Sequence, residues 1–132
     1  MLTMAGACDI RSTVRSKAPN LPFCKIKELI LGDKYELSLV ICSDTLATRM
    51  NREYRKKSYK PNVLSFPLSE NEGEIFLNIR KAAREAKTMG VSTKARIAHL
   101  FIHGCYHLKG LDHGPVMDKA EEKMLRKFGF AA

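Results

Sequence analysis

The chain has 132 residues, which is enough for one domain with a real core and too few for two. We therefore expect a single domain spanning residues 1–132, and the absence of an apolar run near the roughly 18 to 20 residues of a membrane span predicts a soluble protein without a membrane partner. The net charge of +9 favours a polyanionic partner. Because no amphipathic lipid anchor is evident, nucleic acid is preferred over an anionic membrane.

The N-terminus and the cysteines bear on the cellular compartment. The stretch Met1–Asp9 has no basic leader, so we expect a frayed start rather than a signal peptide or a lipoprotein leader. The cysteines form no C-x-x-C pair, and a chain of this size does not need disulfides to hold a core. We therefore predict reduced thiols and a cytoplasmic location, and the thiols concerned are Cys8, Cys24, Cys42 and Cys105.

The first half of the chain predicts two strands and two helices. A short strand is expected over 9–14 and a brief helix over 22–31, which has a proline at its start and a glycine just past its end. Residues 35–42 alternate and then become wholly apolar, as a sheet strand does. Ser43-Asp44 then offers an N-cap for a helix that reaches about Tyr54.

The second half predicts a hairpin followed by three helices. Two short strands, 62–67 and 74–78, flank a polar loop. Asn78 and Ser92 are expected to cap helices over 78–89 and 92–109, a last helix is expected over 115–128, and each of the three is followed by a glycine. The second of these is apolar nearly all round and should be central. The predicted fold is α+β (α/β-like), with a single mixed sheet packed with helices around a central metal-binding helix.

All four histidines fall in one short stretch. On a helix, His103 and His107 are four residues apart, so both lie on one face and can reach a common metal ion. His99 shares that stripe, but at about 1.5 Å per residue it lies roughly 12 Å from His107 along the axis, too far for one ion. Gly110 can end the helix and turn the chain back so that His113 joins. The predicted metal ligands are therefore His103, His107 and His113, and His99 supports them or packs in the core.

Three neutral imidazoles leave the fourth tetrahedral position to water, which is the open geometry of a catalytic zinc site. We therefore predict one Zn²⁺ ion with a metal-bound water that takes part in catalysis. Asp112 precedes His113 and could orient a ligand imidazole by accepting its second N–H. A helix-end or turn role for Asp112 is the alternative interpretation.

The spacing of the histidines is that of metzincin proteases, but Gly104 stands where their catalytic glutamate follows the first histidine. Without that carboxylate the peptidase mechanism loses its proton acceptor, so a metalloprotease is disfavoured. Glycine inside a helix costs about 1 kcal/mol relative to alanine. Either tight packing against a strand or close approach of a substrate would explain its presence.

The densest basic stretch of the chain covers residues 49–60 and contains one acid, Glu53. A surface that binds the nucleic-acid backbone is the functional interpretation, and a solvated helix face with its following loop is the alternative. The basic residues are Arg49, Arg52, Arg55, Lys56, Lys57 and Lys60.

The histidine block resembles the signature H-G-x-x-H-L-x-G-x-D-H of the YbeY family of endoribonucleases, also called rRNA maturation factors. It stands here as His103-Gly-Cys-Tyr-His107-Leu-Lys-Gly-Leu-Asp-His113. A second family block is similar to Asn51-Arg-Glu-Tyr-Arg55 followed by Asn62-Val-Leu-Ser-Phe-Pro67, and Gly73-Glu-Ile-Phe-Leu77 is similar to the family's G-D-I strand. Asn62 and Glu74 depart from aspartates in the family pattern.

This resemblance implies a zinc-dependent, single-strand-specific endoribonuclease that acts in 3′-end maturation of small-subunit (16S) rRNA and in ribosome quality control. The ribosome or ribosomal proteins would be partners. By the same resemblance, Arg55 matches the family's functional arginine, whose guanidinium could grip the scissile phosphate. The alternative is a ribosome assembly factor that has a structural zinc and little intrinsic nuclease activity.

Overall fold

A four-stranded mixed sheet forms the middle layer of the computed structural model, which describes residues 6–15 and 19–130. Its strands stand in the order β1-β2-β4-β3, with bounds β1 (Cys8–Ser12), β2 (Glu36–Cys42), β3 (Val63–Ser69) and β4 (Glu72–Asn78). The first three strands in this order are parallel, and β3 pairs antiparallel with β4 at the edge. The predicted single mixed sheet is confirmed.

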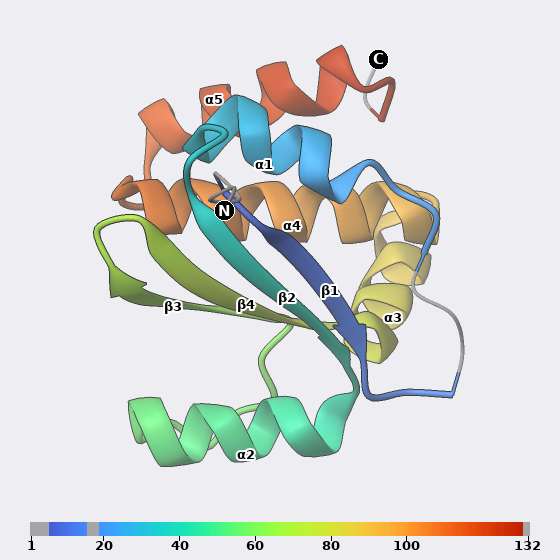
Figure 1. The fold of residues 1–132 in the computed structure, drawn as a ribbon. Helices are drawn as coiled ribbons and strands as arrows, with labels where there is room; N and C mark the ends of the chain where they lie inside the picture. The colour runs from blue at the N-terminus through green and yellow to red at the C-terminus, as the bar shows by residue number, and fades with distance from the viewer. Residues whose placement is uncertain (1–5, 16–18, 131–132) are drawn as a thin grey trace.

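Five helices of the described residues pack on this sheet: α1 (Phe23–Leu31), α2 (Asp44–Arg55), α3 (Ile79–Met89), α4 (Thr93–Lys109) and α5 (Pro115–Lys127). Figure 1 shows α2 alone beneath one face, whereas α1, α4 and α5 lie above the other. The helix α4 contacts β3 and β4 and also α1, α3 and α5, so it is the central helix of the fold. The α+β prediction with a central helix at this position is confirmed.

Alternation along the strands builds an apolar core on each face of the sheet. In β2, Leu39 and Ile41 pack in the core that includes α1 and α4, whereas Val40 and Cys42 pack in the core that includes α2. Burial fixes α4 along most of its length, because its buried residues are Ile97, Ala98, Leu100, Phe101, Ile102, Gly104 and Cys105. This helix is therefore a rigid support for the side chains at its exposed stripe.

Two of the predicted helix caps are confirmed. The Ser92 hydroxyl accepts a hydrogen bond from the Ala95 N–H at 3.0 Å, at the start of α4. The Asn78 side chain accepts one from the Lys81 N–H at 3.1 Å, at the start of α3. Each cap satisfies a backbone donor that the first turn of a helix leaves without an intrahelical partner.

The predicted cap at the start of α2 takes a different form. Ser43 makes no side-chain capping bond. The Asp44 carboxylate instead accepts from Asn78 Nδ2 at 2.9 Å and from the Arg84 guanidinium at 2.8 and 3.0 Å. These bonds tie α2 to β4 and α3, so this acid fixes the helix to its neighbours rather than closing its own first turn.

The polar loop predicted between the hairpin strands is mostly strand. β3 continues to Ser69 and β4 already begins at Glu72, with Ser69 paired to Glu72. Strand pairing overrides the low strand propensity of this stretch, because the ladder extends into the exposed end of the hairpin where polar side chains face solvent. The predicted strand boundaries were therefore too short.

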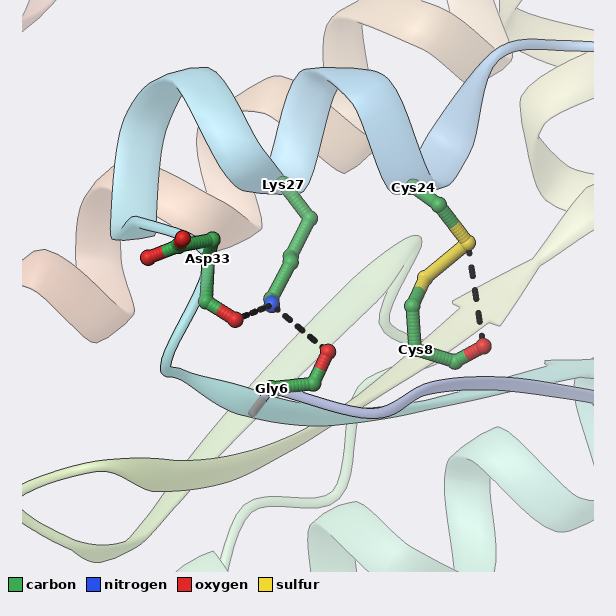
Figure 2. The surroundings of a disulfide bond; sticks show 5 residues. All are labelled: Gly6, Cys8, Cys24, Lys27 and Asp33. Atoms are coloured by element: carbon green, nitrogen blue, oxygen red, sulfur yellow. Dashed lines mark hydrogen bonds between the residues drawn. A yellow bond between two sulfur atoms is a disulfide. The ribbon is translucent and has the colours of Figure 1, made fainter. Parts of the chain in front are cut away.

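The prediction of reduced cysteines is wrong for one pair. Cys8 on β1 and Cys24 on α1 form a disulfide with a Cα–Cα distance of 5.7 Å (Figure 2). The crossover from β1 to α1 returns the helix over its own strand, which brings together two cysteines that are 16 residues apart. Cys42 and Cys105 are free, as predicted, and both are buried, where a thiol packs as a small apolar side chain.

Lys27 reinforces this junction one turn further along α1, where Figure 2 shows it pointing to the same side of the helix as Cys24. Its side chain is only 1% exposed. Its Nζ donates to the Gly6 carbonyl at 3.1 Å and lies 3.5 Å from the Asp33 carbonyl. Backbone carbonyls thus stabilise a buried ammonium that would otherwise be costly.

No helix in residues 6–15 and 19–130 is long and apolar enough to cross a membrane. The expected frayed start over Met1–Asp9 falls partly outside the described residues, which begin at Gly6. It is wrong for Cys8 and Asp9, which already belong to β1.

Candidate active site

The three predicted ligand histidines meet at the C-terminal end of α4. His103 and His107 project from the same face of the helix, one turn apart. Gly110 ends the helix with φ +106°, a conformation that glycine adopts without strain, and its N–H donates to the His107 carbonyl at 3.0 Å. The chain then turns back and places His113 beside the other two imidazoles. The predicted role of Gly110 as the stop of this helix is confirmed.

The three imidazoles are close enough to share one ion. Their ring centroids are 4.8 to 4.9 Å apart, and ligand nitrogens of the three residues lie within 4.8 Å of one another. His107 Nε2 and His113 Nε2 are 3.1 Å apart. Nitrogen ligands at about 2.0 Å from a tetrahedral ion stand roughly 3.3 Å from each other, so the triad matches such a site to within small side-chain rotations.

The electrostatics of His107 also suit a metal ligand. Burial lowers its pKa, and the neighbouring imidazoles of His103 and His113 lower it further. The neutral imidazole is therefore favoured at neutral pH, and this form offers the lone pair that binds a metal. The three histidines fit a metal ion by geometry and by donor chemistry.

His99 lies outside the triad, as its distance along the helix predicts, and contacts a residue that sequence reasoning missed. Glu121 on α5 places one carboxylate oxygen 2.8 Å from His99 Nε2 and the other 2.6 Å from His103 Nδ1. The sequence does contain a signal for Glu121: it stands four residues after Met117, so both lie on the same side of α5, and both are buried. A glutamate on the buried side of an amphipathic helix is almost always paired with a hydrogen-bond donor or a cation.

Glu121 is only 5% exposed and is ionised. Burial alone would raise its pKa, but the hydrogen bonds from His103 and His99 outweigh burial and bring the pKa to about 2. A buried carboxylate against the second nitrogen of a ligand imidazole is the arrangement that orients histidines in many metal sites. Sequence reasoning offered Asp112 for this position. Asp112 is exposed and makes no hydrogen bond or ion pair within the described part of the chain.

Gly104 is buried between α4 and the sheet. A Cβ at this position would lie 3.0 Å from Ser65 Oγ and 3.1 Å from Ile75 Cδ1, and the Gly104 carbonyl accepts from Ser65 Oγ at 3.1 Å. Tight packing against β3 and β4 thus accounts for the glycine. Any larger side chain here would require Ser65 or Ile75 to move, and the carboxylate that a protease uses as its base is absent.

Arg55 is the last residue of α2, and two contacts hold its guanidinium. Its Nη1 donates to Asn51 Oδ1 at 3.0 Å and to the Tyr59 hydroxyl at 2.8 Å. Asn51 is fully buried, and its Nδ2 donates to the Tyr59 carbonyl at 3.0 Å. No residue of the described ranges bonds Nε or Nη2 of Arg55. These donors remain for an anionic ligand.

A cleft of about 310 Å³ joins Arg55 to the histidines, although α2 and α4 lie on opposite faces of the sheet. The two helices can share a cleft because β3 is an edge strand, and the cleft lies along it. Its lining residues are Arg55, Tyr59, Asn62, Val63, Leu64, Ser65, His103 and His107.

The two residues that depart from the family pattern, Asn62 and Glu74, lie in different parts of the structure. Asn62 lines the cleft, and its Nδ2 donates to both oxygens of Glu85 at 3.1 and 3.2 Å. Glu74 lies outside the cleft, where it accepts from Ser38 at 3.4 Å and is 3.8 Å from the Arg11 guanidinium. The other predicted RNA-binding residues are exposed on α2 and on the loop after it, namely Arg49, Arg52, Lys56, Lys57 and Lys60.

The chain is similar to known proteins over nearly its whole length. Residues 12–129 match the family model described as Endoribonuclease YbeY. The Endoribonuclease YbeY of Aromatoleum aromaticum is 40% identical over 124 residues, which cover 92% of this chain and 79% of that protein. The protein of the same name from Polynucleobacter asymbioticus is 36% identical over 103 residues, covering 71% of this chain but only 66% of the relative.

A solved structure has the same fold. The solution structure of TM1509 from Thermotoga maritima superposes with a TM-score of 0.70, covers 92% of this chain and 88% of that one, and is 20% identical in sequence. At that identity the likeness establishes the fold alone. The match to the family model and the identity to the Aromatoleum protein establish the relationship itself: this chain belongs to the YbeY endoribonuclease family.

Proposed function

We propose that this protein is a zinc-dependent, single-strand-specific endoribonuclease that cleaves RNA in the cleft along β3. The observation that carries the proposal is that Arg55 lines one cleft together with His103 and His107, two members of the histidine triad. Three histidines that can hold a metal ion and a guanidinium with donors that no described residue bonds are groups that can catalyse phosphodiester cleavage. The name of the relatives, Endoribonuclease YbeY, supports the same reaction.

Zinc is the proposed ion, one per chain, because three imidazoles with room for a fourth ligand are the usual set of a catalytic zinc. When bound, zinc would act as a Lewis acid at the scissile phosphodiester. His103, His107 and His113 would hold it. Of these, His107 and His113 are exposed, so the ion would face the cleft and not the core.

Arg55 is the proposed catalytic residue of the chain itself. Its Nη1 is fixed by Asn51 and Tyr59, so Nε and Nη2 are presented without reorganisation to a phosphate in the cleft. Preorganised donors stabilise charge that develops in a transition state, and a planar guanidinium binds two phosphate oxygens at once. Arg55 would therefore bind the scissile phosphate and stabilise the charge that develops on its oxygens.

The exposed basic residues of α2 and its following loop would bind the RNA backbone on the approach to Arg55. Single-strand specificity is part of the proposal because of the family resemblance. The family supports small-subunit rRNA as the substrate, with 3′-end maturation and ribosome quality control as the cellular role and ribosomal components as partners. We further propose that the chain is a single domain, since one sheet and its two cores include all its described helices and strands.

A cytoplasmic location follows from a ribosomal substrate. The Cys8–Cys24 disulfide weighs against it, because thiols of cytosolic proteins are normally kept reduced. Free-thiol labelling of the protein in rapidly quenched cells, combined with fractionation, tests both points.

The test of the function is cleavage of single-stranded RNA by highly purified protein. Arg55→Ala and His107→Ala should each abolish cleavage, whereas Arg126→Ala, which removes an exposed arginine of α5, should cleave at the parental rate. Both active-site variants alter exposed side chains, so circular dichroism should show the parental fold. Cleavage at the parental rate by folded, metal-free His107→Ala would refute the proposal.

The alternative is an assembly factor that uses zinc structurally. It predicts that the protein unfolds when the metal is chelated and that rRNA binding is independent of Arg55. The exposed position of the triad, at the end of a helix that the core already holds, favours the catalytic function.

A further inference from the structure

A continuous line of polar contacts leads from the ligand His103 back to the wall of the same cleft. Glu121 bridges His103 and His99, and the other ring nitrogen of His99, Nδ1, lies 3.3 Å from Arg96 Nη1. The Arg96 guanidinium is in turn paired with Glu85 at 2.9 Å. Glu85 accepts the hydrogen bonds of the cleft residue Asn62. The line thus joins α5, α4 and α3 to Asn62, the residue just before β3.

The Arg96 guanidinium and the Glu121 carboxylate set the directions of the hydrogen bonds along this line. A guanidinium is always protonated and can only donate, so His99 Nδ1 must accept. The other ring nitrogen of His99, Nε2, then carries a proton and donates to Glu121. The other oxygen of Glu121 is left to accept from His103 Nδ1. A hydrogen-bonded proton on Nδ1 leaves the lone pair of His103 on Nε2.

Burial makes this arrangement specific. Glu121 is buried, and the side chains of Arg96 and Glu85 are only 14% and 24% exposed. In such surroundings a polar group without its partner is expensive, so alternative tautomers and rotamers are disfavoured. The ion pair between α3 and α4 thereby supports, over three contacts, the arrangement in which Glu121 accepts from His103 Nδ1.

We infer that Arg96, acting through His99 and Glu121, is a positioning residue that holds His103 in the Nδ1–H tautomer with Nε2 directed at the metal. Arg96, His99 and Glu121 need not touch the substrate for this role. The inference takes the triad to be a metal site and in that respect rests on the proposed function. At the other end of the line, Asn62 lines the cleft and donates to Glu85. The Arg96–Glu85 ion pair therefore also holds the Asn62 side chain in place.

The first experiment measures zinc affinity by competition with a chromogenic chelator, using zinc alone as the probe. Glu121→Gln should bind zinc about 10- to 100-fold more weakly, the usual cost of removing a partner of a ligand histidine. Arg96→Met should weaken binding by about 3- to 10-fold, because it removes only one hydrogen bond from the line. Both effects are expected in protein whose circular dichroism is that of the parent.

Matched controls exist for both variants. Glu122→Gln makes the same change one residue later, at an exposed acid that pairs with Arg126. Arg84→Met removes another arginine that pairs with a carboxylate, Asp44, away from the histidines. Neither control should change zinc affinity by more than twofold. If Glu121→Gln binds zinc as tightly as Glu122→Gln, the inference is wrong.

A second measurement does not depend on metal binding. Nitrogen-15 spectra of histidine in the metal-free protein should show the proton of His103 on Nδ1 and that of His99 on Nε2, and Arg96→Met should mix the tautomers of His99. A proton on Nε2 of His103 would overturn the inference even if the protein cleaves RNA. If the parent protein binds no zinc, the proposed function fails, and the spectra still decide the tautomers.

Discussion

The Tyr59 hydroxyl accepts a hydrogen bond from Arg55 Nη1 at 2.8 Å, and this tyrosine lines the cleft beside the arginine. Tyr59→Phe keeps the ring and removes only that bond. A hydrogen bond is worth about 0.5 to 1.5 kcal/mol, so we expect cleavage of single-stranded RNA to slow by about 2- to 10-fold. Tyr54→Phe is the control, because its exposed hydroxyl makes no hydrogen bond within the described residues. Equal rates for the two variants would show that Tyr59 does not position Arg55.

The site was predictable from sequence where its geometry is local. The spacing of His103 and His107 on one helix, with Gly110 after them, determines which histidines can meet. The same reasoning set His99 apart from the ligands. Each of these relations depends on distances within a single helix and its stop, which the sequence specifies directly.

The parts that sequence reasoning missed depend on contacts between elements. Glu121 reaches His103 because α5 packs on α4, and Tyr59 reaches Arg55 because Asn51 draws the loop back onto α2. Cys8 and Cys24 meet because of the crossover that follows β1. No spacing rule in the sequence encodes these distances, and Asp112 was considered only because it adjoins a ligand in the chain.

Metal removal separates catalysis from folding. Treatment with a chelator should abolish cleavage, while far-ultraviolet circular dichroism at 25 °C stays unchanged, because the buried residues of α4 hold the helix without the ion. The melting temperature should fall only by the amount that mass action predicts for loss of a bound ligand. His107→Ala should show no response to the chelator. Cooperative unfolding of the parent on chelation would instead support the structural-zinc alternative.

The anchor of α2 should make stability depend on pH. Hydrogen bonds from Arg84 and Asn78 lower the pKa of Asp44 to about 2. Because the folded pKa is below that of the unfolded chain, about 3.9, the stabilisation is complete well above that value, begins to be lost as the pH approaches it, and continues to fall towards pH 2. Asp44→Asn should therefore lower the free energy of unfolding by about 1 kcal/mol at pH 7, a value reduced for the partial exposure of the carboxylate.

Urea denaturation at pH 7, 4 and 3 tests this dependence. The difference between Asp44→Asn and the parent should shrink steadily across that series. Asp9→Asn, at an exposed strand carboxylate, should leave the unfolding midpoint unchanged throughout. A difference that stays constant down to pH 3 would mean that the Asp44 carboxylate contributes through its shape and not through its charge.

The Cys8–Cys24 disulfide should stabilise the fold without affecting the metal site. It closes a loop with a sequence separation of 16, and the chain-entropy model assigns about 3 kcal/mol to a loop of this size. A phosphine reductant should therefore lower the urea midpoint of the parent and leave that of the double variant Cys8→Ser/Cys24→Ser unchanged. Zinc affinity should be the same before and after reduction, because β1 and α1 contribute no residue to the cleft. A parent protein that does not respond to the reductant would show that this bond does not stabilise the fold in solution, even though the two cysteines are adjacent.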